Sequence, residues 1–72
     1  MQFVALVHPD ETNGGFWTEV PAVPGCGSQG DAMHEATEMT KDAIQGYIES
    51  MRKHGKVPPA DATVAVAVTV VA

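Results

Sequence analysis

One long helical pattern dominates the sequence, and a chain with a single helix can build only a thin, two-layered fold. Apolar side chains recur at three- and four-residue steps from Met33 to Met51, which is the spacing of one helix face. Asp31 is expected to cap the start of this helix, and Gly55 to follow its end. Because one helix covers only one face of a sheet, the opposite face must meet solvent or another molecule.

Two β-forming stretches joined by a turn predict a hairpin before the helix. Residues 2–8 and 16–20 carry apolar and aromatic side chains at alternating positions, with an Asn-Gly pair between them. That pair readily adopts the positive φ angles of a hairpin turn. Pro21 and Pro24 then interrupt the pattern, so residues 26–28 are expected to form only a short third strand at a sheet edge.

The segment after the helix, residues 63–71, is the most strongly β-forming part of the chain. A right-handed crossover through the helix would return this segment as a fourth strand, parallel to the first. The sequence therefore predicts one α+β domain over residues 1–72, of order β-β-β-α-β. Its mixed four-stranded sheet has the order 3-2-1-4, with the helix on one face. Large side chains on one face of the last segment are Val64, Val66, Val68 and Val70.

Composition limits the function of so small a chain. The 72 residues include nine acidic and four basic side chains, which give a net charge of −5. This balance argues against direct nucleic-acid binding and favours a basic protein partner. A single cysteine, Cys26, excludes an internal disulfide framework and a multi-cysteine zinc site. The sequence shows neither a signal peptide nor a membrane-spanning stretch, so a soluble, cytoplasmic protein is expected.

The residues with catalytic potential do not predict an active site. Two of the three histidines, His34 and His54, are separated by about 30 Å along one helix. A metal-dependent nuclease of this layout needs an acidic residue on the first strand, and residues 3–7 contain none. The sequence therefore predicts no enzymatic activity, no metal and no cofactor. Three helix carboxylates at seven-residue steps suit a solvated face: Glu35, Asp42 and Glu49.

The segment from Gly14 to Asp31 resembles the HicB-type antitoxins. A Gly-Gly-Phe-Trp stretch at residues 14–17 leads into Pro-Ala-Val-Pro-Gly-Cys-Gly-Ser-Gln-Gly-Asp at residues 21–31. The Glu-Ala pair at residues 35–36 also matches the family pattern, and about three quarters of the chain is covered. Two positions depart from it, because the family usually has an acidic residue at Ala22 and a Thr or Ser at Ala32.

The resemblance implies a truncated, degenerate ribonuclease-H-like fold. It also implies a partner of the HicA type, a small basic toxin that cleaves messenger RNA and is neutralised when the antitoxin covers its active surface. Many family members carry a further DNA-binding module, which this sequence lacks after residue 71, so operator binding is not expected. Two alternatives stay open: a solitary homo-oligomeric binding module with no toxin, and, less favoured, a degenerate metal-dependent nuclease.

Two sets of residues are the candidate contact surfaces. One aromatic ring of the Phe16 and Trp17 pair should enter the core, while the other faces the helix-free side or anchors a partner. The last strand, uncharged on both faces, predicts self-association through its four large valines. Candidate contacts with the toxin lie on the second strand and the loop after it: Trp17, Glu19, Pro24, Gly25, Cys26, Ser28 and Asp31.

Overall fold

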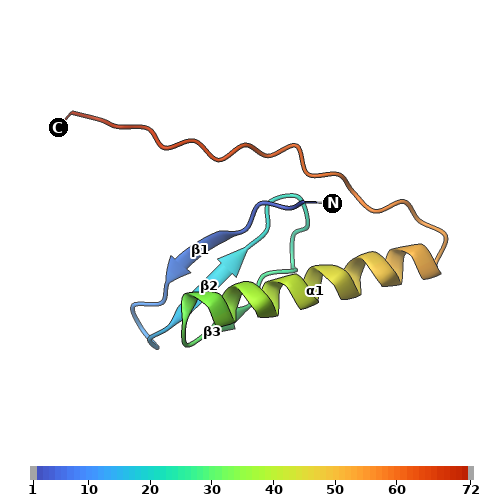
Figure 1. Ribbon diagram of the computed structural model, residues 1–72, viewed down its shortest axis with the longest axis horizontal. Coiled ribbons are helices and arrows are strands. Elements are labelled where there is room, and N and C mark those ends of the chain that lie inside the picture. Colours follow the sequence, from blue (N-terminus) through green and yellow to red (C-terminus); the bar gives the residue numbers. More distant parts are fainter. Residues whose placement is uncertain (1, 72) are drawn as a thin grey trace.

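A computed structural model describes residues 2–71 and shows a small antiparallel sheet with one helix lying across one face (Figure 1). Its strands are β1 (Leu6–Pro9), β2 (Phe16–Glu19) and β3 (Gln29–Gly30), followed by α1 (Met33–Lys53). The sheet has the order β1-β2-β3, and β2 pairs antiparallel with both neighbours.

The turn between β1 and β2 confirms the predicted hairpin. Gly14 and Gly15 have φ angles of 78° and 77°, in the left-handed region that glycine tolerates best. The Gly-Gly pair, and not the expected Asn-Gly pair, therefore has the positive φ angles, since Asn13 has none. The carboxylate of Asp10 accepts the backbone N–H groups of Thr12 and Asn13, each at 3.0 Å. These two hydrogen bonds stabilise the charged carboxylate and lower the pKa of Asp10.

The helix is also confirmed, although its first turn differs from the prediction. Ala32 is the N-cap residue and makes no side-chain capping hydrogen bond, so the prediction that Asp31 caps the helix is wrong. Asp31 instead donates its backbone N–H to the carboxylate of Glu35, at 3.3 Å. At the other end, Gly55 has a φ of 71° and donates its N–H to the carbonyl of Arg52, as expected for a glycine that ends a helix.

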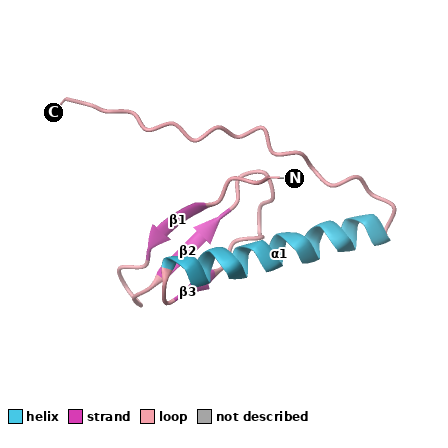
Figure 2. Cartoon of the chain, viewed as in Figure 1, coloured by secondary structure: helices cyan, strands magenta, loops and turns pink. Residues whose placement is uncertain are grey.

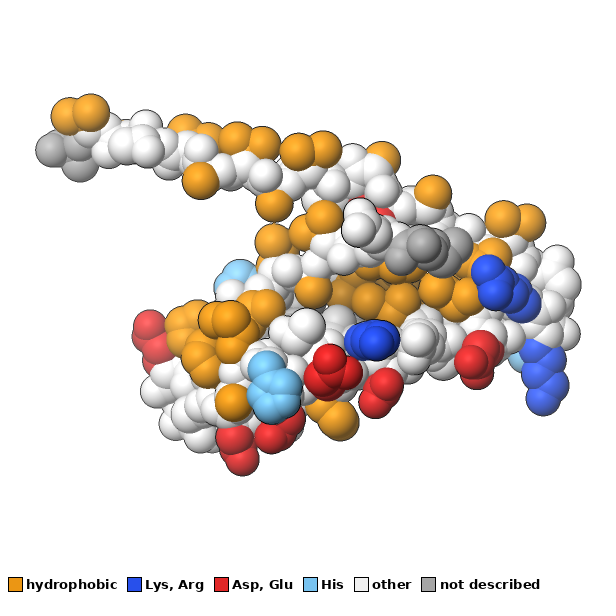
Figure 3. Space-filling model, viewed as in Figure 1, with side chains coloured by type: hydrophobic (Ala, Val, Ile, Leu, Met, Phe, Trp, Pro, Cys, Tyr) orange, Lys and Arg blue, Asp and Glu red, His pale blue; other side chains and the backbone are white. Residues whose placement is uncertain are grey.

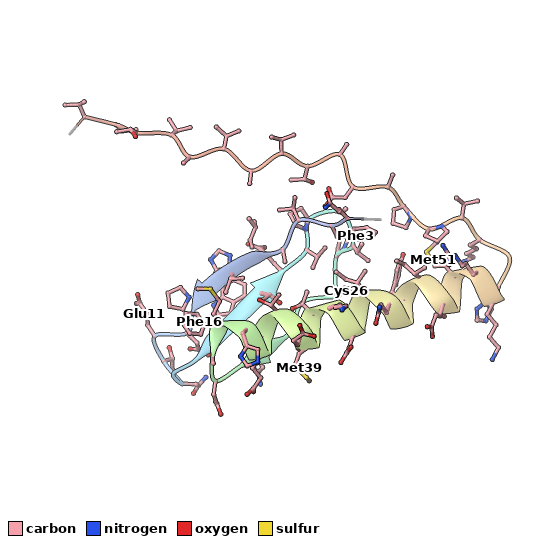
Figure 4. All side chains as sticks on the ribbon, in the orientation of Figure 1. Phe3, Glu11, Phe16, Cys26, Met39 and Met51 are labelled. Atoms are coloured by element: carbon pink, nitrogen blue, oxygen red, sulfur yellow. The ribbon has the colours of Figure 1, made fainter. Side chains whose placement is uncertain are left out.

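Small side chains let α1 lie close to the sheet. Ala36 is fully buried and Thr40 is almost so. Gly30 of β3 faces this part of the helix, and a Cβ atom there would lie 2.6 Å from the backbone nitrogen of Ala36. Met39 points away from the sheet (Figure 4) and is half exposed, so Thr40 provides the inward position in this helix turn.

The apolar core lies beneath the loop that joins β2 to β3. Val20, Val23 and Cys26 are buried, and Phe3 and Ile44 pack against them. Figure 4 shows Cys26 between the sheet and the helix. The loop therefore folds inward and contributes more of the core than the two-residue strand that follows it.

Two predicted strands have different limits in the structure. The first begins at Leu6 and not at residue 2, because β2 ends at Glu19 and leaves residues 2–5 without a facing strand. The third lies at Gln29–Gly30 and not at residues 26–28. Cys26 is used in the core instead, and the ladder resumes only where Trp17 faces Gln29.

The predicted fourth strand is wrong, and with it the four-stranded sheet of order 3-2-1-4. Residues 63–71 contain no strand (Figure 2) and run as an extended segment away from the sheet (Figure 1). A stretch of valines favours extended backbone, but a strand also requires a neighbour for its hydrogen bonds. The described sheet stops at β1, so the propensity of this segment is not satisfied within its own chain.

Candidate partner-binding surface

The face of the sheet opposite the helix carries an aromatic and charged cluster. His8 and Trp17 face each other across β1 and β2, and their rings stack with centroids 4.2 Å apart and planes 20° apart. The Nε2 atom of His8 lies 2.8 Å from the Oε1 atom of Glu19. These contacts hold the indole of Trp17 in one orientation while 40% of the residue is exposed.

Cross-strand pairing adds Leu6 to the same face, opposite Glu19. We call Leu6, His8, Trp17 and Glu19 the outer face. Trp17 and Glu19 are among the candidate contacts expected from the sequence, whereas Leu6 and His8 are not. The signal for both was available only in the register, because residues directly opposite in a hairpin share a face.

Beneath the outer face, a line of hydrogen bonds attaches β2 to the helix. Ser28 donates its backbone N–H to the hydroxyl of Thr18 at 2.9 Å. The hydroxyls of Thr18 and Thr40 are bonded to each other, and Thr40 donates to the carbonyl of Ala36 at 2.7 Å. Thr18 points inward, so its neighbours in β2, Trp17 and Glu19, must point outward.

The loop after β2 divides the remaining candidate contacts into exposed and enclosed residues. Pro24, Gly25 and Asp31 are exposed, and Pro24 and Gly25 share a shallow hollow with Glu19. Ser28 is half-buried and bonded to Thr18. Cys26 is buried, which raises the pKa of its thiol.

The four valines of the predicted self-association surface are strongly exposed in the structure. Val64, Val66, Val68 and Val70 are between 73% and 79% exposed. Figure 3 shows apolar side chains exposed along the projecting segment. The structure therefore keeps them apart from the outer face.

Charge on the described surface is mostly negative. Red carboxylates lie at the hairpin end and along the visible edge of the helix, while blue cations lie near its middle and at its far end (Figure 3). Within residues 2–71, no group of three His, Cys, Asp or Glu side chains could hold a metal ion. The one helix of this part of the chain is too polar to cross a membrane.

These features define a small α+β domain, with an exposed aromatic side chain on a sheet face that the helix leaves uncovered. The family model that describes the HicB-like antitoxins of bacterial toxin-antitoxin systems matches residues 3–70. The chain therefore belongs to the HicB-like antitoxin family. Family membership favours a binding role over an enzymatic one.

Relatives of known sequence and structure agree with this assignment. A UPF0150 protein of Thermoplasma acidophilum is 41% identical over 61 residues, which are 85% of this chain and 87% of that protein. A UPF0150 protein of Synechocystis is 42% identical and covers 71% of this chain and 66% of its own. The crystal structure of the N-terminal domain of the Burkholderia pseudomallei antitoxin HicB superposes with a TM-score of 0.75 at 29% identity. It covers 92% of this chain and 74% of that one.

Proposed function

We propose that this protein is an antitoxin that binds and neutralises a small basic, RNA-cleaving toxin of the HicA type. The observation that carries the proposal is the outer face, where Trp17 is exposed and its ring is stacked on that of His8. Large aromatic residues fixed in this way are frequent energetic anchors of protein interfaces. Membership in an antitoxin family gives this anchor a partner of the toxin class.

Charge supplies the second argument for a basic partner. Eight of the nine acidic residues lie within the first fifty residues, where Lys41 is the one basic residue. A toxin that binds RNA needs a cationic surface, and this antitoxin offers a negative surface able to compete for it. Charges of this kind chiefly speed association, so the association rate should fall as salt rises.

The proposed contacts extend from the outer face onto the adjoining loop. Trp17 and Glu19 would touch the toxin directly, together with the exposed Pro24, Gly25 and Asp31. Two prolines stiffen this loop, which lowers the entropy lost on docking. Two further residues of the predicted set, Cys26 and Ser28, would act by holding the loop in shape, since both are enclosed.

Co-expression and binding kinetics test the proposal. The basic protein encoded beside this gene should be toxic alone and harmless in the presence of this chain. Trp17→Ala should raise the dissociation rate about 30-fold or more, as expected for a central anchor. Met39→Ala is the matched control, because Met39 is an exposed apolar residue on the far side of the helix and should leave the rate unchanged. Continued toxicity in the presence of the native chain would reject the proposal.

Several wider features belong to the same proposal. We place the chain as a single domain of truncated ribonuclease-H-like type that acts in the cytoplasm, with no contact to nucleic acid and no nuclease activity of its own. Purified protein should therefore leave RNA intact in Mg²⁺ or Mn²⁺. Cleavage that disappears in Glu35→Ala would instead support the degenerate nuclease.

A second candidate function is a homo-oligomeric binding module that has no toxin. The exposed valines of residues 63–71 favour self-association, which is compatible with either function. The neighbouring gene separates the two, since only the antitoxin requires a short reading frame for a basic protein. If no such gene exists, the solitary module is the better account.

A further inference from the structure

We infer that residues 63–71 of one copy add as a strand to the free edge of β1 in a second copy, reciprocally. In this arrangement Val64, Val66, Val68 and Val70 enter an apolar groove between the start of the second copy's sheet and its helix. The inference specifies the self-association named above. It rests on none of the toxin contacts.

The segment itself needs a cover. Residues 63–71 contain only Val, Ala and Thr, and all of them are exposed in the single chain. An uncharged segment with high strand propensity and bare backbone is a template for pairing with another chain. A second copy of the chain is present wherever the protein is made, so it can always supply a strand that pairs with this segment.

The groove matches the chemistry of this segment. Its floor is made by Phe3, Ala5, Ile44 and Ile48, and its volume is about 570 Å³. Figure 3 shows the apolar floor as a hollow between the helix and the start of the chain. Lys41, Glu49 and Arg52 stand among the lining residues, so charges border the groove while apolar side chains fill its centre.

The backbone of β1 offers the hydrogen-bonding partner. β1 is the terminal strand of the described sheet and pairs with β2 on one side. An extended segment can therefore add to its other side, as in strand addition by peptides. Phe3 and Ala5, which line the groove, immediately precede β1. One added strand could therefore pair with the edge of β1 and place side chains in the groove.

The connector explains why the added strand comes from another copy. Asp61 accepts the backbone N–H of Val4 and also that of Thr63, at 2.5 Å and 2.7 Å. These hydrogen bonds hold the start of the segment beside the residues that precede β1 of its own chain, and from there the segment runs apart from the sheet (Figure 1). Pro58 and Pro59 keep the preceding connector extended. Exchange of an identical segment between two copies closes the assembly symmetrically.

The Burkholderia pseudomallei domain supports this course of the chain. Residues 1–54 are three quarters of the sequence, so a superposition that covers 92% must include part of the segment after the helix. The matched region of that crystal structure therefore continues past the end of the helix.

Oligomeric state gives the first test. The native chain should sediment at micromolar concentration as a species of twice 7.6 kDa or a multiple of that dimer. Val68→Lys should weaken the dimer by about 100-fold or more, since loss of one buried valine is worth roughly 10- to 100-fold and a buried charge adds to it. Val57→Lys is the control, because Val57 is exposed in the connector and outside the proposed strand. A native chain that stays monomeric would overturn the inference.

A mixing experiment identifies the occupant of the groove. Two versions of the full chain, both carrying Cys26→Ala and checked for native circular dichroism, receive either Ala5→Cys or Val66→Cys and are refolded together. Strand exchange predicts a disulfide between the two different chains. If a disulfide instead forms only when both cysteines are placed in one chain, the segment folds onto its own β1 and the inference fails. Both tests omit the toxin, so their failure leaves the antitoxin proposal standing, and loss of toxin binding leaves the exchange standing.

Discussion

Replacing the hydroxyl of Thr18 should destabilise the protein far more than replacing that of Thr40, although the two are bonded to each other. A hydroxyl donates only one hydrogen. The consistent assignment runs from the N–H of Ser28 to Thr18, from Thr18 to Thr40, and from Thr40 to the carbonyl of Ala36. Thr18 and Thr40 are both buried, with 4% and 2% of their surface exposed. Valine keeps the shape of threonine and removes only this chemistry.

The two substitutions leave different groups without partners. Thr18→Val removes the acceptor of the Ser28 N–H in a half-buried site, which costs about 2 kcal/mol within a usual span of roughly 1–3 kcal/mol. Thr40→Val leaves the hydroxyl of Thr18 free to turn to the carbonyl of Ser28, 3.3 Å away. The expected cost is then about 0.5 to 1 kcal/mol. In a domain of this size, Thr18→Val should lower the Tm by about 10 °C and Thr40→Val by about 5 °C or less.

Urea unfolding followed by far-ultraviolet circular dichroism gives the free energies of unfolding. All variants must be compared at one protein concentration, because self-association adds to apparent stability. The double variant completes the cycle and measures the coupling of the two hydroxyls. Equal costs for the two single variants, or a larger cost for Thr40→Val, would refute the assigned direction of these hydrogen bonds.

Three further predictions concern the fold. Gly30→Ala should lower the free energy of unfolding in urea by about 2 kcal/mol or more, because its Cβ would lie 2.6 Å from the nitrogen of Ala36. Gly46→Ala is the control: Gly46 has open space in mid-helix, so this change should stabilise the protein by about 1 kcal/mol. The pKa of Asp10 is lowered on folding from 3.8, so its charge stabilises the fold above that pH and ceases to do so as pH falls below it. Asp10→Asn should therefore flatten the acid limb of the stability curve. The thiol of Cys26 is buried with a raised pKa, so iodoacetamide should modify it slowly until urea unfolds the chain.

Local signals in the sequence were sufficient for the hairpin and the helix. The turn-forming residues between β1 and β2 predicted their antiparallel pairing, although Gly14 and Gly15, not Asn13 and Gly14, have the positive φ angles. Gly55 marked the end of α1. The start of the helix was less predictable. Asp31 and Ala32 are adjacent, and only the structure shows that Ala32 occupies the cap while Asp31 bonds to Glu35.

The candidate surface was predictable in part. The sequence favoured Trp17 as an anchor but left its face open, because Phe16 and Trp17 are equally apolar neighbours. The buried hydrogen bond between the hydroxyls of Thr18 and Thr40 turns Trp17 to the outer face. The periodicity of apolar residues could not have revealed this bond. Cys26, expected in a short strand at the sheet edge, lies outside β3 and is buried in the core.

The missing fourth strand shows what an apolar pattern does and does not specify. The pattern of residues 63–71 predicts that they pair with a strand, because their alternation of large and small side chains suits a β-sheet. The pattern carries no information on which copy of the chain supplies the partner strand. That choice depends on the connector, where Asp61 holds the segment beside Val4 and two prolines keep the approach extended.

The same alternation that places the helix also exposes the binding surface. A strand sends successive side chains to opposite faces, so fixing Thr18 against Thr40 turns Trp17 and Glu19 outward, and the hairpin register then brings His8 against Trp17. A slip of one residue would bury the indole and expose the hydroxyl. The hydrogen bonds of Thr18 on the helix side of the sheet thus set the orientation of Trp17 on the outer face. Thr18→Val should therefore weaken toxin binding through the orientation of β2, although Thr18 itself is enclosed beneath the surface that would meet the toxin.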